Sequence, residues 1–138
     1  MGKTPLESVA GLHVLITGAA QGMGLLFAKQ ACREGAARVV IWDIDTARLD
    51  AAAEELRRLG GTVEAYVVDL ADPAQIHHYA AEAVESGGID VLVNNAGVVT
   101  GTSFAKHRTA QITATMQVNA LAPMYLTQPW LPAMKLAT

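Results

Sequence analysis

Three glycines stand where a phosphate group could bind. The segment 17–24 reads TGAAQGMG, with glycines at 18, 22 and 24, between an apolar run and a helical pattern. Glycine has no Cβ atom to block an anion, and a helix N-terminus offers backbone N–H groups and positive potential. The spacing is G-x-x-x-G-x-G rather than the commoner G-x-G-x-x-G, and an ordinary strand-to-helix turn could use the same residues. The position directly after an apolar run favours phosphate binding.

A carboxylate follows this turn at a sequence spacing that is typical of dinucleotide-binding units. Asp43 ends the second apolar run, about 20 residues after Gly24, where dinucleotide-binding units carry an acidic residue that accepts hydrogen bonds from a ribose. Its negative charge would repel a 2′-phosphate, so the residue favours NAD over NADP. Asp43 could instead cap the helix that begins near Thr46. Asp45 is able to serve as that cap, which would leave Asp43 free.

Two more polar motifs end apolar runs. Asp69-Leu70 ends the third run, and Asp69 could accept a hydrogen bond from an adenine amino group or cap the next helix, for which Asp72 is better placed. Asn94-Asn95-Ala96-Gly97 ends the fourth run and on its own indicates a turn. Together the four motifs mark one edge of a sheet, where ligands bind in open α/β folds.

The strands that position these motifs are predicted from short β-branched runs. Such runs, mostly unbroken by charge, suit strands buried on both faces. They are Leu12–Thr17, Arg38–Asp43, Thr62–Asp69 and Ile89–Asn94.

Helical patterns separate these runs. They extend over Gly22–Arg33, from Asp45 or Thr46 to Gly60, from Asp72-Pro73 to Gly87, and from about Thr109 to Tyr125 or beyond. This alternation predicts an α/β class, Rossmann-type doubly wound parallel sheet with right-handed crossovers and strand order 3-2-1-4. Residues 1–138 are expected to form one dinucleotide-binding portion.

The composition excludes several classes of protein. The chain has 138 residues, 51% hydrophobic and 17% charged, with a net charge of -3, which is typical of a globular domain and gives no basic surface for nucleic acid. One cysteine, Cys32, excludes a disulfide framework and favours a cytoplasmic location. No apolar run is long enough for a membrane anchor, and Met1–Ser8 lacks the apolar core of a signal peptide. Adjacent His77 and His78 point in different directions on a helix, so no metal site is predicted.

Taken together, the motifs resemble the short-chain dehydrogenase/reductase family. Each is weak alone, but they follow the family's order through nearly the whole chain. The residues that carry the resemblance are Thr17–Gly24, Asp43, Asp69-Leu70, Asn94–Gly97 and Asn119 within Gln117–Ala120.

The resemblance implies NAD as the cofactor, with NADP less favoured, and a place for each motif. Thr17 and Asn94 would brace loops, and Asn119 would help to hold a water-mediated proton relay as a supporting catalytic residue. The implied cofactor contacts are Gly18, Ala20, Gln21, Gly22, Met23 and Gly24 for the pyrophosphate, Asp43 and Ile44 for the adenosine ribose, Asp69 and Leu70 for the adenine, and Asn95, Ala96, Gly97 and Val118 for the nicotinamide ribose.

The chain departs from the family pattern in its catalytic residues. The family uses a serine, and a tyrosine whose pKa is lowered by a lysine four residues later. None of the tyrosines, at 66, 79 and 125, has lysine at that spacing. In the family these elements follow the segment that matches 131–138. We therefore expect a chain whose sheet is truncated and which lacks the catalytic serine, tyrosine and lysine of the family. It is expected to bind the adenosine end of the cofactor.

Two classes of function follow from this departure. At the family level we expect NAD-dependent oxidoreduction of a small alcohol or ketone. The alternative is a non-catalytic dinucleotide-binding module, or a fragment completed by another chain. An open fourth strand and uncovered apolar helix surface would favour a homo-oligomer or a complementing chain.

Overall fold

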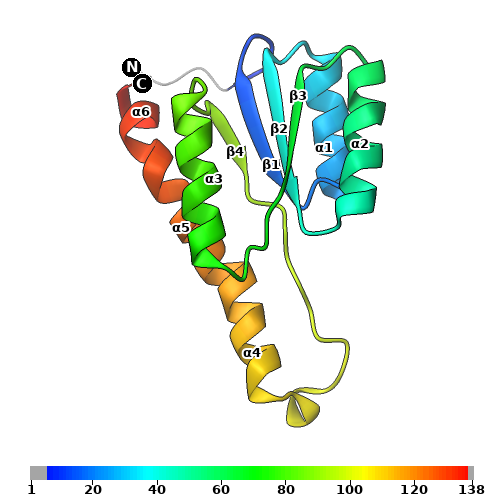
Figure 1. Ribbon diagram of the computed structural model, residues 1–138, viewed down its shortest axis with the longest axis vertical. Helices are drawn as coiled ribbons and strands as arrows, with labels where there is room; N and C mark the ends of the chain where they lie inside the picture. Colours follow the sequence, from blue (N-terminus) through cyan, green and yellow to red (C-terminus); the bar gives the residue numbers. More distant parts are fainter. Residues whose placement is uncertain (1–5, 137–138) are drawn as a thin grey trace.

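The computed structural model describes residues 6–136 as a parallel four-stranded sheet with helices on both faces (Figure 1). Neighbouring strands follow the order β3-β2-β1-β4, which confirms the predicted topology. Val14 on β1 stands beside Val39 on β2 and Val91 on β4. The expectations for residues 1–5 and 137–138 lie outside the described residues. The strands are β1 (His13–Thr17), β2 (Arg38–Asp43), β3 (Val63–Val67) and β4 (Val91–Val93).

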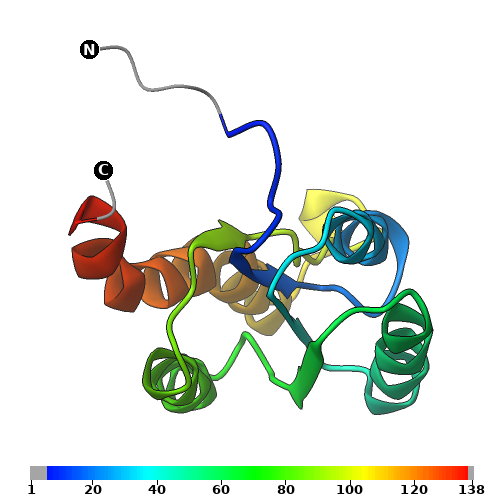
Figure 2. The ribbon, with the colours of Figure 1, turned by 90° about the horizontal axis from the view of Figure 1, so that it is seen from above.

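Helices cover the sheet in two layers. Figure 2 shows α1 and α2 on one face, and α3 with the C-terminal helices on the other. The main helices are α1 (Gly22–Arg33), α2 (Thr46–Arg58), α3 (Pro73–Glu85), α4 (Thr109–Met116), α5 (Ala122–Thr127) and α6 (Leu131–Leu136).

Alternate residues of the central strands enter two separate cores. Val14 and Ile16 of β1 are buried on the side of α1 and α2, whereas Leu15 is buried with residues of α3 and α5. β2 divides in the same way, since Ile41 and Trp42 face opposite cores. Burial on both faces is what the unbroken apolar runs predicted for a parallel sheet.

The outer strands are shorter than predicted. β3 ends at Val67 and β4 at Val93, whereas the predicted runs extend to Asp69 and Asn94. Both strands also begin one or two residues later than predicted. The chain leaves β4 early because Asn95 N–H turns back onto the carbonyl of Val93, at 2.9 Å. The residues that follow the two strands then belong to the loops above the sheet.

The C-terminal helical path is segmented where a single helix was predicted. A π-helical turn, η2 (Gln117–Leu121), separates α4 from α5, and a 3-10 turn, η3 (Gln128–Trp130), precedes α6. Pro123 has no N–H to donate to the carbonyl of Asn119 four residues earlier, so regular α-helical bonding cannot continue there. A further 3-10 turn that was not predicted, η1 (Phe104–Lys106), lies in the loop before α4.

A buried arginine links β2, β3 and the end of α3 at the edge opposite the glycine turn. Arg38 is buried and donates through Nε to Glu64 Oε1 at 2.9 Å and through Nη2 to Glu64 Oε2 at 2.8 Å. Its Nη2 also donates to Ser86 Oγ at 2.6 Å, just after α3. The hydrogen bonds from Arg38 lower the pKa of Glu64.

Removing this carboxylate is expected to reduce stability in a pH-dependent way. In Glu64→Gln the buried Arg38 keeps its charge without a counterion, which costs about 2 kcal/mol of unfolding free energy at pH 7. Because the folded state lowers the pKa of Glu64, its contribution is fully present above the unfolded value of about 4.3 and is lost as the pH falls through the folded value. Urea unfolding from pH 7 to pH 3 should therefore show a steeper loss for the parent than for Glu64→Gln.

The matched control is the exposed ion pair on α2. Glu54→Gln removes a partner of Arg58, at 3.2 Å, where both side chains are largely exposed, and is expected to change stability by less than about 0.5 kcal/mol. Equal pH slopes for the parent and Glu64→Gln would contradict the assigned role of the Arg38–Glu64 pair.

Candidate functional site

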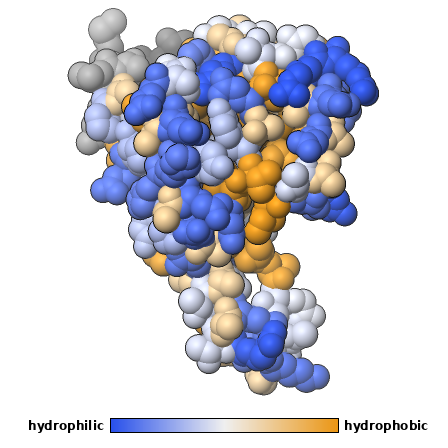
Figure 3. Space-filling model, in the orientation of Figure 1, coloured by the Kyte–Doolittle hydropathy of each residue, from blue (hydrophilic) through white to orange (hydrophobic). Residues whose placement is uncertain are grey.

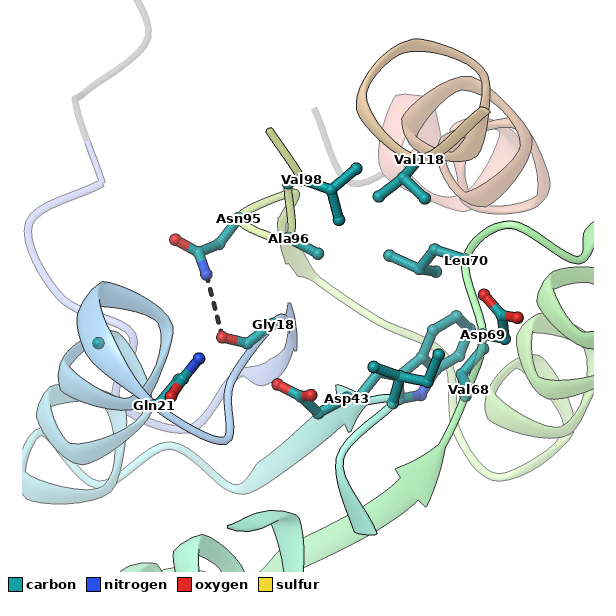
Figure 4. Close-up of a pocket in the computed structure, with 14 residues that line it drawn as sticks. Gly18, Gln21, Asp43, Val68, Asp69, Leu70, Asn95, Ala96, Val98 and Val118 are labelled. Carbon is teal, nitrogen blue, oxygen red and sulfur yellow. Dashed lines mark hydrogen bonds between the residues drawn. The ribbon is translucent and has the colours of Figure 1, made fainter. Parts of the chain in front are cut away.

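A cleft of about 450 Å³ opens at the carboxyl ends of the strands (Figure 4). All four strand ends contribute to it, together with the first helix turn and the π-helical turn. Most of the predicted binding residues meet here. The residues that line it are Gly18, Gln21, Gly22, Trp42, Asp43, Ile44, Val68, Asp69, Leu70, Asn95, Ala96, Gly97, Val98 and Val118.

Three of the predicted cofactor contacts do not line the cleft. Met23 is 66% exposed on α1, Ala20 is buried beneath the turn, and Gly24 packs against the loop after β4. Trp42, Val68 and Val98 also line the cleft, although none of them was predicted as a cofactor contact. All three adjoin predicted residues along the chain, and this adjacency was the signal that could have found them.

The glycine turn is packed too tightly to hold larger residues. A Cβ atom on Gly24 would overlap the carbonyl oxygen of Gly18, and one on Gly18 would lie 2.8 Å from the Cα of Ala96. Gly22 has φ of +57°, which favours glycine, but a Cβ atom there would meet nothing within 4 Å. The turn is therefore closed toward the protein and open toward the cleft.

The first turn of α1 is available to an anion. Its N-cap residue, Gln21, makes no side-chain capping hydrogen bond, and this turn contains no acidic residue. The leading N–H groups of a helix have no partner within the helix and carry partial positive charge. An anionic group in the cleft would satisfy them.

Hydrogen bonds lock the β1 and β4 loops together. Thr17 Oγ1 accepts the backbone N–H of Asn95 at 3.2 Å and that of Ala96 at 3.1 Å. Asn95 Nδ2 donates to the carbonyls of Thr17 at 3.1 Å and Gly18 at 3.2 Å, and the second bond is drawn in Figure 4. Asn94 Nδ2 donates to Thr127 Oγ1 of α5 at 3.3 Å. The bracing roles of Thr17 and Asn94 are thus confirmed, and Asn95 braces the turn as well.

Asp43 connects the glycine turn to the loop after β2. Its Oδ2 accepts the N–H of Ala20 and its Oδ1 that of Asp45, each at 3.0 Å. Asp45 caps α2 by accepting the N–H of Arg48, which confirms that Asp43 does not serve as the cap. Each carboxylate oxygen can accept a further hydrogen bond. Asp43 can therefore receive donors from a ligand without giving up the turn.

The opposite side of the cleft is mostly apolar. Figure 4 shows Leu70, Val98 and Val118 facing the same space. On the face of the molecule that Figure 3 presents, hydrophobic surface gathers in the middle, between α3 and α2. Asp69 lies at its margin, where Oδ1 accepts the N–H of Ala71 at 2.8 Å. Asp72 caps α3, as predicted. A flat aromatic ring would suit the apolar side of this cleft.

Asn119 fixes the position of Val98. Its Oδ1 accepts the N–H of Val98 at 2.8 Å, and its Nδ2 donates to the carbonyl of Val98 at 2.7 Å. Both bonds tie the π-helical turn to the loop after β4. The side-chain amide of Asn119 therefore positions the cleft's wall.

Neither a metal cluster nor a membrane-spanning helix is found in residues 6–136. The arrangement that the fold does show is a 3-2-1-4 parallel sheet, a glycine turn opening the first helix, and an acidic residue ending the second strand. These features define a Rossmann-type nucleotide-binding fold.

The family follows from comparison with known proteins. A family profile described as short chain dehydrogenase matches residues 12–138, and the chain belongs to this family. Estradiol 17-beta-dehydrogenase 11 of Macaca fascicularis is 40% identical over 129 residues, which are 93% of this chain and 43% of that protein. The human 17-beta-hydroxysteroid dehydrogenase 13 is 38% identical over 132 residues, with the same coverage of the two chains. The chain thus spans less than half the length of these relatives.

Solved structures share the fold closely. A metagenomic short-chain oxidoreductase in complex with NADP has a TM-score of 0.87 and 34% identity, over 95% of this chain and 60% of that one. L-sorbose reductase from Gluconobacter frateurii, complexed with NADPH and L-sorbose, has a TM-score of 0.86 and 28% identity, over 94% and 50% of the two chains.

Proposed function

We propose that the cleft binds a nicotinamide dinucleotide, and that the chain supplies the cofactor site of an oxidoreductase that acts on an alcohol or ketone. The observation that carries this proposal is the glycine turn, which is closed against Gly18 and Asn95 but open toward the cleft at Gly22. A bound dinucleotide would supply the nicotinamide carbon that accepts or gives a hydride.

Each part of the cofactor has residues whose chemistry fits it. The N–H groups at the start of α1 would hold the pyrophosphate, and Asp43 and Ile44 would flank the adenosine ribose. Asp69 and Leu70 would border the adenine. Asn95, Ala96, Gly97 and Val118 would border the nicotinamide ribose, as the family resemblance implies, while Asn119 would support a proton relay.

Within this site we propose a preference for NAD(H). The ground is the Asp43 carboxylate, which would accept hydrogen bonds from ribose hydroxyls and repel a 2′-phosphate. The similar solved structures named above are complexes with NADP or NADPH, so the preference must be measured on this chain.

We further propose that the 138 residues bind the cofactor without catalysing hydride transfer. The chain contains no tyrosine followed four residues later by lysine, the pair that exchanges a proton with the substrate in this family. A calorimetric titration with NADH, and a hydride-transfer assay of the same sample with a panel of alcohols and ketones, test both points. Binding without turnover is expected. Turnover would refute the catalytic part, and absence of binding would refute the whole proposal.

An alternative function is that of a fragment completed by another polypeptide or by a second copy. Within residues 6–136, β4 pairs with β1 alone, and its three residues are only partly buried. Leu26 on α1 is 61% exposed and Met124 on α5 is 65% exposed, which leaves apolar helix surface uncovered. Sedimentation should then show self-association, or a complex once the complementing chain is present. A monomer that melts cooperatively would refute this alternative.

A further inference from the structure

Two charged side chains bridge the same gap beside the cleft. The gap separates the glycine turn from the loop between β2 and α2. Asp43 spans it by accepting N–H groups from Ala20 and Asp45. Arg48 spans it a second time, because its guanidinium donates to the side-chain oxygen of Gln21 and its Nε lies 3.5 Å from Asp45 Oδ2. The side chains of Asp43 and Arg48 therefore each connect the glycine turn to the loop between β2 and α2.

Arg48 is held near the cleft by contacts that leave it accessible. Its side chain is 60% exposed, and its bond to Gln21 places it against a residue that lines the cleft. Figure 4 shows Gln21 and Asp43 on the same side of the cleft as Gly18. A guanidinium has five N–H donors, more than the contacts to Gln21 and Asp45 require. Arg48 can therefore donate hydrogen bonds to a ligand as well.

We propose that Arg48 is a specificity-determining residue that contacts the 2′-phosphate of NADP(H). This inference rests on the proposed function, in which Asp43 binds the adenosine ribose. A phosphate on the 2′-oxygen of that ribose would lie at the gap that both side chains span. Arginine suits this role because its planar fork matches phosphate oxygens, and an arginine near the ribose is what accommodates a 2′-phosphate in dinucleotide sites.

The two residues act on cofactor choice in opposite directions. Asp43 disfavours the 2′-phosphate by charge repulsion, whereas Arg48 favours it by charge-assisted hydrogen bonds. The proposed preference for NAD(H) is therefore smaller than Asp43 alone would produce. NADP(H) enters the same cleft as a weaker ligand.

The test compares ligands that differ only in the 2′-phosphate. The full chain and Arg48→Gln are titrated calorimetrically with NADH and NADPH, and then with 5′-AMP and adenosine 2′,5′-bisphosphate (2′,5′-ADP). Loss of Arg48 should weaken NADPH and 2′,5′-ADP about tenfold, the effect of removing a charged hydrogen bond. Binding of NADH and 5′-AMP should change less than about twofold. Arg48→Lys, which keeps the charge but not the fork, should give an intermediate loss for the two 2′-phosphate ligands.

Arg58→Gln is the matched control, because Arg58 is also an exposed arginine on α2 that pairs with an acidic side chain, Glu54. It should leave all four affinities unchanged. An equal loss for all four ligands in Arg48→Gln would overturn the inference, since Arg48 would then act by holding Gln21. If both Arg48 variants bound NADPH as the parent does, and NADH still bound, this inference would be overturned while the proposed function would stand. Failure of the parent to bind any of the four ligands would overturn the inference and the proposed function together.

Discussion

Gly24→Ala is expected to remove nucleotide binding and to destabilise the chain by about 3 kcal/mol. The new methyl group would overlap the carbonyl oxygen of Gly18 and press on Asn95 Nδ2. Neither atom can rotate away freely, because Asn95 holds the Gly18 carbonyl by a hydrogen bond of 3.2 Å. Relief of the overlap would displace the start of α1 and its N–H groups. Urea unfolding and an NADH titration measure the two effects.

The control for this substitution is another glycine near the cleft loops. Gly101 has no positive φ, and a Cβ atom there would meet nothing within 4 Å. Gly101→Ala should change the unfolding free energy by less than about 0.5 kcal/mol and leave NADH affinity unchanged. If Gly24→Ala behaved like Gly101→Ala, the close packing at the glycine turn would be of no consequence for the site.

Asp43→Ala is expected to weaken NADH by about tenfold or more and to reduce the preference for NADH over NADPH. The ribose would lose its acceptor, and a 2′-phosphate would no longer meet a negative charge. The N–H groups of Ala20 and Asp45 would also lose their partner, at a cost of about 1–2 kcal/mol in stability. The measurement is a pair of calorimetric titrations with NADH and NADPH on the variant and the parent.

Asp50→Ala controls for the loss of one negative charge, because Asp50 is an exposed residue of α2. It should alter neither affinity by more than about twofold. Should Asp43→Ala keep the parent's ratio of NADPH to NADH affinity, the role assigned to Asp43 would be wrong. Asp43→Asn separates the two effects, because it removes the charge while keeping an oxygen that can accept a hydrogen bond.

The parts of the fold that depend on local sequence could be predicted. Apolar runs and helical patterns were sufficient for the 3-2-1-4 sheet, because parallel strands buried on both faces have a distinctive composition. Asp72 was predicted as a cap from its place just before a helical pattern, and Asp45 was one of two candidates for the cap of the preceding helix. Both aspartates accept a backbone N–H of their helix. The motifs at the strand ends meet in one cleft because parallel strands bring their carboxyl ends to one edge.

Features that depend on distant contacts could not be predicted in this way. The bond between Arg48 and Gln21 joins the first turn of α2 to the N-cap residue of α1, and no local pattern indicates it. The π-helical turn before Pro123 was not predicted, because Pro123 in the sequence indicated only an uncertain helix end. Asn95 was assigned to a ligand by resemblance, but its hydrogen bonds to Thr17 and Gly18 emerge only in three dimensions.

The most direct test of nucleotide binding in this cleft is an amide-resolved NMR titration of the full chain with NADH. The N–H signals of Gly18, Gly22 and Gly24, and those of Ala96 and Gly97, should shift with a single saturation curve. The signals at the opposite edge of the sheet, near the Arg38–Glu64 pair, should stay in place. Shifts confined to that opposite edge, or no shifts at saturating NADH, would contradict the account.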